Sequence, residues 1–269
     1  MDNKRAARLI NSVILVVGIV LIVGSLVYLG CIMWQYHKGT AEYDALKEQV
    51  FLEAEQENPS KPAEDEETSK PQESVPDWVS DAQVQSALLD LAEQNPDTVG
   101  WIVFDNMDIS YPVMLGTDDV YYLDHTFSGE VNSAGSIFME AQNHADFQDC
   151  HTILYGHNMK NLSMFGKLKN YKKQDFYEGN EYFTIYTPDA VLRYQIFSYY
   201  DISEDSDVYS VGFQPDQTFQ SFVETCLRRS YYDTGVSVSK QDKIITLSTC
   251  SAEGQRFVVH AKRIEEYWG

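Results

Sequence analysis

Cys250 and Arg256 are the two residues whose types and spacing most directly suggest chemistry. A β-branched, apolar stretch over 243–250 ends at Cys250, and a second such stretch begins at Arg256 after a five-residue connection that contains glycine. Two strands joined in this way form a hairpin, so the thiol and the guanidinium are expected at its mouth. A nearby positive charge favours the nucleophilic thiolate, and a guanidinium also stabilises an oxyanion. The alternative is a buried, inert Cys250 beside a surface Arg256.

A thiol nucleophile needs a base or an imidazolium partner, and His157 is the candidate. It directly follows the apolar stretch 152–155, in the turn Gly156-His157-Asn158. Rigid scaffolds commonly present catalytic side chains from such turns, although a purely structural His157 stays an alternative. Plainer positions, next to a membrane segment, in polar loops or inside a strand, are expected for His37, His125, His144, His151 and His260.

Missing motifs exclude several other chemistries. No CxxC or HxxxH spacing is present, so we expect no zinc or other metal site. The GxGxxG, P-loop and GxSxG patterns are absent as well, which leaves nucleotide binding and serine hydrolase chemistry unsupported. Cys31 lies in an apolar span and Cys226 on the apolar face of a predicted helix. A disulfide between Cys150 and Cys226 is an alternative that nothing in the sequence supports.

The charge of the chain is unevenly distributed. The 269 residues carry a formal net charge of −21, which gives the protein no electrostatic reason to bind nucleic acid. Residues 1–37 carry a net charge of +2, residues 38–77 of −8 and residues 78–269 of −15. The three blocks are expected to be physically different parts of the protein.

Residues 9–36 contain no charged side chain and are predicted to be a transmembrane anchor behind a cytoplasmic tail at 1–8. The apolar run exceeds the about 20 residues that span a bilayer. It ends in the aromatic Met33-Trp34-Gln35-Tyr36, with no small-residue cleavage site, so we favour an uncleaved anchor over a cleaved signal peptide. Basic residues before the span predict a cytoplasmic N-terminus and an extracytoplasmic domain.

Residues 37–77 are predicted to be an acidic stalk. Apolar residues recur at three- to four-residue spacing over 40–57, which predicts a juxtamembrane helix. Four prolines and a run of acids make 59–77 a flexible spacer, because that composition cannot bury a core.

Residues 78–269 are predicted to form one mostly β domain. A helix opens it and ends near Asn95-Pro96, and an amphipathic helix over 215–230 interrupts the later β pattern. Other short stretches are rich in β-branched and aromatic residues and are bounded by turn residues, as strands are. About eight strands in one domain indicate a closed or nearly closed barrel. The strand candidates are 101–104, 109–113, 136–139, 152–155, 182–186, 191–198, 243–248 and 256–262.

These residues together resemble the signature of the sortases, the membrane-anchored cysteine transpeptidases of Gram-positive bacteria. The resemblance rests on Thr246-Leu-Ser-Thr-Cys250, on Arg256 in the next strand and on Tyr155-Gly-His-Asn158 upstream, and it covers roughly residues 78–269. The chain looks like class B in its N-terminal helix and in the long helix before the cysteine-bearing strand. The resemblance implies a closed, eight-stranded sortase-type β-barrel.

The resemblance also implies a mechanism and partners. Cys250, as a thiolate, attacks the carbonyl after the threonine of a C-terminal sorting motif on a secreted protein. His157 protonates the leaving amine, and Arg256 holds the substrate and stabilises the oxyanion. An amine of the peptidoglycan precursor then resolves the thioacyl-enzyme, and no cofactor is implied. The residues implied to border the substrate groove are Tyr155, Ser248 and Thr249.

Three alternatives stay open at this point. The chain could be a pilin-linking sortase, a surface-anchored binding domain in which Cys250 is inert, or a thiol hydrolase in which water resolves the acyl-enzyme. In each case the expected location is the cell membrane, crossed once by the N-terminal helix.

Overall fold

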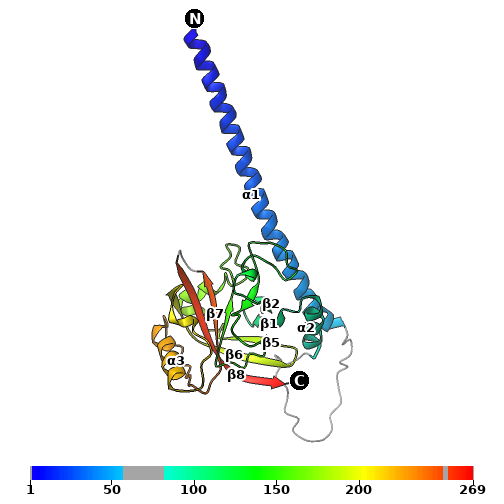
Figure 1. Ribbon diagram of the computed structural model, residues 1–269, viewed down its shortest axis with the longest axis vertical. Coiled ribbons are helices and arrows are strands. Elements are labelled where there is room, and N and C mark those ends of the chain that lie inside the picture. The colour runs from blue at the N-terminus through cyan, green and yellow to red at the C-terminus, as the bar shows by residue number, and fades with distance from the viewer. Residues whose placement is uncertain (1, 57–81, 251–253, 269) are drawn as a thin grey trace.

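The computed structural model describes residues 2–56, 82–250 and 254–268. Helix α1 (Asp2–Gln56) projects from the domain as a long rod and meets it only near its C-terminal end (Figure 1). Its stretch Val13–Phe51 is, by length and composition, long and apolar enough to cross a membrane, with a mean hydropathy of 2.8 in its most apolar part. The apolar side chains of that part are exposed rather than packed against the domain.

Eight strands form a closed barrel within the described residues, as the sequence predicted. Their order around the barrel is β1-β2-β3-β4-β7-β8-β6-β5, and β5 pairs with β1 to close it. All eight predicted strands are confirmed, although β6 and β8 extend beyond the predicted stretches and pair along their length. The strands are β1 (Thr98–Phe104), β2 (Ser110–Met114), β3 (Ile137–Met139), β4 (His151–Tyr155), β5 (Tyr182–Tyr186), β6 (Ala190–Ser203), β7 (Ile244–Cys250) and β8 (Gln255–Trp268).

The strand order contains parallel pairs that no local pattern predicts. β2 pairs with β3 and β4 pairs with β7 in parallel, whereas the other neighbours are antiparallel. Parallel neighbours need a long crossover, and the chain between β4 and β7 supplies β5, β6 and a helix on the way. Short 3-10 helices in the loops were also not predicted: η2 (Tyr121–Leu123), η3 (Leu168–Lys172), η4 (Gln174–Phe176) and η5 (Asp207–Tyr209).

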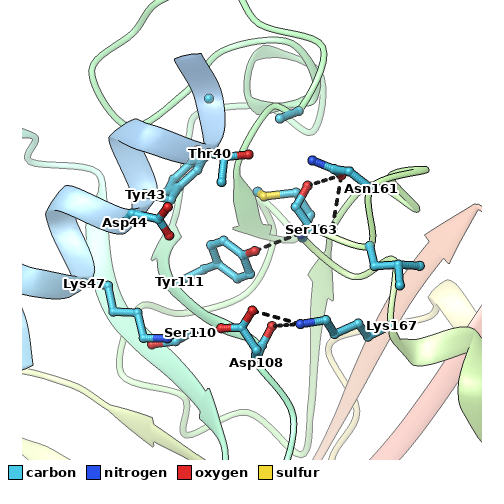
Figure 2. A pocket seen from close by; sticks show the side chains of 14 residues that line it. Thr40, Tyr43, Asp44, Lys47, Asp108, Ser110, Tyr111, Asn161, Ser163 and Lys167 are labelled. Atoms are coloured by element: carbon cyan, nitrogen blue, oxygen red, sulfur yellow. Dashed lines mark hydrogen bonds and ion pairs between the residues drawn. The ribbon is translucent and has the colours of Figure 1, made fainter. Parts of the chain in front are cut away.

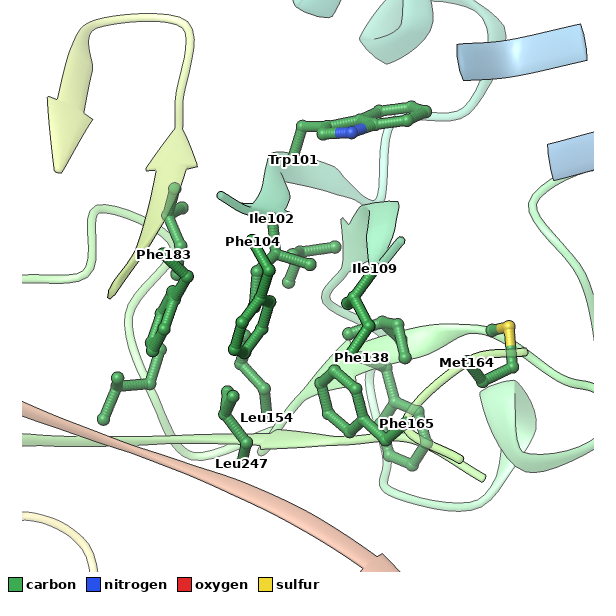
Figure 3. Packing of buried hydrophobic residues seen from close by; sticks show 14 of the residues in the cluster. Trp101, Ile102, Phe104, Ile109, Phe138, Leu154, Met164, Phe165, Phe183 and Leu247 are labelled. Carbon is green, nitrogen blue, oxygen red and sulfur yellow. The ribbon is translucent and has the colours of Figure 1, made fainter. Parts of the chain in front are cut away.

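Large apolar side chains from distant parts of the sequence fill the barrel (Figure 3). Phe104 of β1 stacks on Phe183 of β5 with ring centroids 4.9 Å apart. Leu154 of β4 is the register partner of Leu247 of β7, and both are fully buried. Alternate residues of a strand face the same side, so these positions all point inward. The packed interior makes the barrel a rigid frame for the loops at its ends.

The C-terminal part of α1 belongs to the packed structure. Tyr43, Leu46 and Val50 lie on one face of the helix and are buried in the main hydrophobic core. The Tyr43 hydroxyl donates a 2.6 Å hydrogen bond to the Gly135 carbonyl. The predicted juxtamembrane helix is therefore present up to Gln56, and the barrel domain covers its apolar face. The division of the chain at 36/37 and 77/78 stays a prediction, and residues 57–77 lie outside the described residues.

Polar contacts join α1 to the loop that follows His157 (Figure 2). Asp108, in the turn between β1 and β2, lies between two lysines. Lys167 of the loop donates to its Oδ2 at 2.9 Å, and Lys47 of α1 donates to its Oδ1 at 3.1 Å. These hydrogen bonds lower the pKa of Asp108, so the carboxylate stays charged and links helix, turn and loop.

Helix α2 (Ala82–Gln94) opens the domain as predicted and ends just before Asn95. It buries Val84, Leu88 and Leu91, which lie on one face at helical spacing. Asp77 and Ser80, which by residue type and position are the candidate N-terminal caps of this helix, lie outside the described residues.

Helix α3 (Gln217–Arg229) confirms the predicted amphipathic helix. The Asp216 carboxylate caps it by accepting backbone hydrogen bonds of 2.8 and 3.2 Å from its first turn. Its apolar face packs against β6 and includes Cys226, whose predicted place in the core is confirmed. Cys226 and Cys150 are both free, so the alternative of a disulfide is wrong. Burial raises the pKa of Cys226 to about 12, which makes it an inert thiol.

Two fully buried histidines cross-link β4, β7 and β8. His151 Nδ1 donates to the Ser210 carbonyl at 2.8 Å, and its Nε2 accepts from the Thr246 hydroxyl at 2.7 Å. The same hydroxyl oxygen accepts from His260 Nδ1 at 2.8 Å, and His260 Nε2 accepts from Tyr200 at 3.0 Å. Both rings must be neutral, because a neutral imidazole has one nitrogen that donates and one that accepts, as these four contacts require. The expectation that His151 lies in a polar loop is wrong, because β4 starts one residue earlier than its apolar pattern.

This pair predicts a loss of stability in mild acid. Burial lowers the pKa of His151 to about 4, whereas the unfolded chain protonates near 6.5. Between these pH values the unfolded state therefore binds a proton at His151 that the folded state does not bind. The stability of the folded state falls as the pH drops from about 6.5 toward 4. The His151 contribution alone amounts to about 3 kcal/mol. We expect the Tm measured by calorimetry to fall between pH 7 and pH 5.

The control for this prediction is a pair of histidine variants. In His151→Asn the Tm should depend less steeply on pH, even if the Tm at pH 7 is lower. His144 is exposed, and its hydrogen bond to Asp149 raises its pKa, so His144→Gln should keep the acid-induced loss. An unchanged Tm between pH 7 and pH 5 in the unsubstituted protein would contradict the prediction.

Candidate active site

The strand order brings His157 and Cys250 to the same end of the barrel. β4 and β7 run in parallel with Tyr155 opposite Ser248, and the Gly156 amide donates to the Ser248 carbonyl at 3.1 Å. His157 and Cys250 each lie two residues beyond this register pair. Parallel strands advance together, so both residues leave the barrel at the same level.

Arg256 reaches the same end through the hairpin of β7 and β8. Cys250 and Arg256 are register partners in this antiparallel pair, which confirms the predicted hairpin. For Cys250 the structure describes the backbone only, and residues 251–253 lie outside the described residues. The backbone nevertheless brings together all three positions that the sequence selected for catalysis.

The His157 imidazole is half-buried and hydrogen-bonded to the neighbouring loop. Its Nε2 lies 2.5 Å from the carbonyl oxygen of Leu123, the last residue of η2. A carbonyl oxygen only accepts, so Nε2 carries the proton in this contact. The backbone carbonyl of His157 accepts from the Phe165 amide at 3.0 Å, which ties the turn to the loop that follows. The ring is thus held with a protonated nitrogen toward Leu123.

Gly156 is required for the close packing of the turn before His157. A Cβ atom at this position would lie 2.4 Å from Ile137 Cδ1 and 2.6 Å from Phe165 Cδ2. Those distances are shorter than any van der Waals contact, and both neighbours are fully buried. Only glycine lets the chain pass close enough to the core to place His157 where it lies.

The Arg256 guanidinium is held by two contacts. Its Nη2 lies 3.0 Å from Oε2 of Glu204, the residue after β6, and its Nη1 donates to the Gln255 carbonyl at 3.2 Å. The Glu204 amide in turn donates to the Gly254 carbonyl at 3.3 Å. The end of β6 and the start of β8 are therefore joined by both backbone and side-chain contacts.

A pocket of about 270 Å³ opens beside these residues. Tyr155 forms part of its wall, and the Tyr155 hydroxyl donates to the buried Glu140 at 2.8 Å. The Tyr209 ring stacks with the Tyr155 ring at a centroid distance of 6.1 Å. The wall is mixed in character, with aromatic, acidic and basic side chains. Its residues are Asp119, Leu123, Phe138, Tyr155, Glu204, Tyr209 and Arg256.

The three residues that the resemblance assigned to the substrate groove lie differently. Tyr155 lines the pocket, whereas Ser248 and Thr249 are almost fully buried. The Ser248 hydroxyl is 2.9 Å from the Tyr209 hydroxyl, so it contacts the pocket wall from behind. Thr249 Oγ1 has no hydrogen-bond partner among the described residues. Their role as groove residues stays a prediction.

Acidic groups near the pocket include two that sequence reasoning missed. Asp119 accepts from the Ala141 amide at 2.7 Å, and its pKa is raised by burial and by the neighbouring Glu140. Glu204 pairs with Arg256, as described. Neither stands in a recognisable motif, and each reaches the pocket because of tertiary folding. Within the described residues no group of three or more His, Cys, Asp or Glu side chains is arranged to hold a metal ion.

Comparison with known families agrees with this geometry. A family model described as a sortase domain matches residues 102–264, which include β4, β7 and most of β8. The chain belongs to the sortase family. Sortases are cysteine transpeptidases, so this sortase is an enzyme of that kind. Sortase B of Listeria monocytogenes is 35% identical over 186 residues, which are 68% of this chain and 76% of the relative.

Solved structures also support class B. The Staphylococcus aureus sortase B–substrate complex has a TM-score of 0.71 and 29% identity to this sortase, over 86% of this chain and 99% of that one. Sortase B of Bacillus anthracis has a TM-score of 0.69 and 31% identity, over 87% and 100% of the two chains. The predicted fold, a closed eight-stranded barrel with an N-terminal helix, matches these structures.

Proposed function

We propose that this sortase cleaves the C-terminal sorting motif of secreted proteins after threonine and joins them to an amine of the peptidoglycan precursor. The observation that carries the proposal is the meeting of His157, Cys250 and Arg256 at one end of the barrel. Only the parallel pairing of β4 with β7 and the hairpin of β7 with β8 produce that meeting. A pocket with aromatic walls lies beside them, as a peptide substrate needs.

In the proposed first step, the Cys250 thiolate attacks the threonine carbonyl and forms a tetrahedral oxyanion. The Arg256 guanidinium stabilises this charge. His157, as the imidazolium, gives its proton to the leaving amine, and the C–N bond breaks to leave a thioacyl-enzyme. The hydrogen bond from Nε2 to the Leu123 carbonyl holds the ring at this end of the barrel, which supports a role for His157 beside Cys250.

In the proposed second step, the acceptor amine attacks the thioester carbonyl. Neutral His157 removes a proton from that amine, the new amide forms, and the Cys250 thiolate leaves. The enzyme then has its starting protonation states, and no external oxidant or cofactor is needed. The similar Staphylococcus aureus sortase B was solved as a substrate complex, which supports substrate binding by this fold.

The proposed location is the membrane surface, with α1 as the anchor and the barrel outside the cell. The end of the barrel at which β7 stops and β8 starts lies on the side from which α1 approaches (Figure 1). Three basic residues precede the apolar stretch, which favours a cytoplasmic N-terminus. A secreted substrate and a lipid-linked amine would both reach this site at the bilayer.

The test is a transfer assay with the full chain in detergent micelles. Peptides with varied sorting motifs are incubated with and without a peptidoglycan-type amine, and the products are identified by mass spectrometry. We expect cleavage after threonine and a new amide to the added amine. Hydrolysis products that ignore the amine would indicate a thiol hydrolase, and preference for a lysine side chain of a protein acceptor would indicate a pilin-linking enzyme. No cleavage of any motif would favour a binding domain.

A further inference from the structure

Glu204 contacts the proposed oxyanion-stabilising residue directly, although no motif singles it out. Its carboxylate Oε2 is 3.0 Å from Arg256 Nη2, and both side chains line the pocket. The Arg256 side chain is 30% exposed and that of Glu204 is 56% exposed. The pair therefore lies at the rim, where a substrate would cover it.

The sheet register explains why this pair forms. Ile202 of β6 is opposite Arg256 of β8, and Ser203 is opposite Gln255. Glu204 follows two residues after Ile202, and its amide donates to the Gly254 carbonyl. Residues two apart point to the same side of a strand, so Glu204 is the diagonal neighbour of Arg256 on one face. Such neighbours are within reach of long side chains.

Arg256 needs such a partner because its side chain is long, can adopt several rotamers and has other acceptors nearby. Ordering an arginine side chain costs rotamer entropy. Asp119, another acid of the same pocket, offers a competing carboxylate. The Gln255 carbonyl accepts from Nη1, and the Glu204 carboxylate pairs with Nη2. Together these two contacts fix the plane of the guanidinium. A guanidinium has five N–H groups, so a held one still has donors for an acyl oxygen.

We propose that Glu204 is a positioning residue that holds the Arg256 guanidinium at the pocket beside the Cys250 position of β7. The proposal rests on the proposed role of Arg256 in the transpeptidase reaction. Glu204 does not touch the reacting atoms and acts only through Arg256. Its negative charge weakens the field of the guanidinium, so its benefit must come from geometry rather than from charge.

The test is a double-substitution cycle measured as kcat/KM for cleavage of a sorting-motif peptide by the full chain. Glu204→Ala should lower kcat/KM about tenfold when Arg256 is present. In the Arg256→Ala background the same substitution should change kcat/KM less than twofold, because the group that Glu204 positions is gone. Glu204→Gln keeps an oxygen that accepts from Nη2, so it should stay within about threefold of the unsubstituted enzyme.

Controls separate this role from a structural one. Glu224→Ala removes an exposed acid of α3 and should leave kcat/KM unchanged. The Tm of Glu204→Ala should stay near that of the unsubstituted protein, since its amide contact to Gly254 remains. Higher activity in Glu204→Ala, or an equal loss in both backgrounds, would overturn the positioning role. Full activity in Arg256→Ala would instead refute the proposed role of Arg256, whatever Glu204 does.

Discussion

Replacement of Cys250 by alanine is expected to lower both cleavage and amine transfer by at least about 10⁴-fold. Without the thiol no thioacyl intermediate forms, and the remaining groups contribute only substrate binding and charge stabilisation. Loss of a nucleophile in comparable hydrolases removes most of the rate enhancement. The measurement is the transfer assay with a sorting-motif peptide, followed by intact-mass detection of the acyl-enzyme. The acyl adduct should appear in the unsubstituted protein and be missing in Cys250→Ala.

Cys150→Ala is the matched control, since it removes a half-buried thiol just before β4, at the other end of that strand from His157. Burial raises the pKa of the Cys150 thiol, so it is less reactive than an ordinary cysteine, and the buried Cys226 is less reactive still. Alkylation by iodoacetamide near neutral pH should therefore modify Cys250 before Cys150 or Cys226. Full activity in Cys250→Ala, or an acyl adduct on another residue, would refute the nucleophile assignment.

Local sequence patterns were sufficient to predict the strands but not their arrangement. Ile153, Leu154 and Leu247 stand in short apolar stretches between turn residues, and such stretches identify strands wherever they pair. Whether β4 pairs with β7 depends on contacts between residues about 90 positions apart. No sequence periodicity predicts the pairing of β4 with β7, because that pairing depends on how the whole barrel closes.

Part of the candidate site could likewise be predicted from the sequence, and part could not. Only five residues separate Cys250 from Arg256 in the sequence, so their proximity followed from the spacing alone. The sequence selected His157 from its turn after an apolar stretch and from the family resemblance, but its position at the same end of the barrel follows from the β4–β7 pairing. Glu204 and Asp119 were missed because they reach the pocket through tertiary folding and stand in no motif.

Helix α1 shows how an amphipathic pattern can be found while its partner stays unknown. The spacing of Tyr43, Leu46 and Val50 predicted a helix with an apolar face, which was assigned to a stalk. In the structure that face is covered by the barrel, next to the Lys47–Asp108 contact. A continuous helix from the apolar stretch into the core gives the barrel a defined orientation relative to the proposed membrane. Composition alone does not reveal such packing.

His157→Gln is expected to lower the rate of peptide cleavage about 10³-fold, within the range of general acid–base catalysis. The glutamine amide can still donate to the Leu123 carbonyl, so the turn keeps its contact, but it cannot give a proton to a leaving amine. The loss should therefore depend on the leaving group. A p-nitrophenyl ester needs no protonation when it leaves, so acylation of Cys250 by such an ester should fall at least tenfold less than peptide cleavage. Stopped-flow absorbance of released nitrophenolate measures the ester reaction, and chromatography of the products measures peptide cleavage.

His144→Gln provides the matched control, because it makes the same substitution at an exposed histidine that pairs with Asp149 and does not line the pocket. It should leave both reactions unchanged. Equal losses for ester and peptide in His157→Gln would mean that the histidine acts mainly on Cys250, as an ion-pair partner of the thiolate, and not as the acid for the leaving amine. Unchanged peptide cleavage in His157→Gln would remove the residue from the mechanism altogether. The ratio of the two losses thus separates proton donation from thiolate stabilisation, two roles that one imidazolium would perform at the same position.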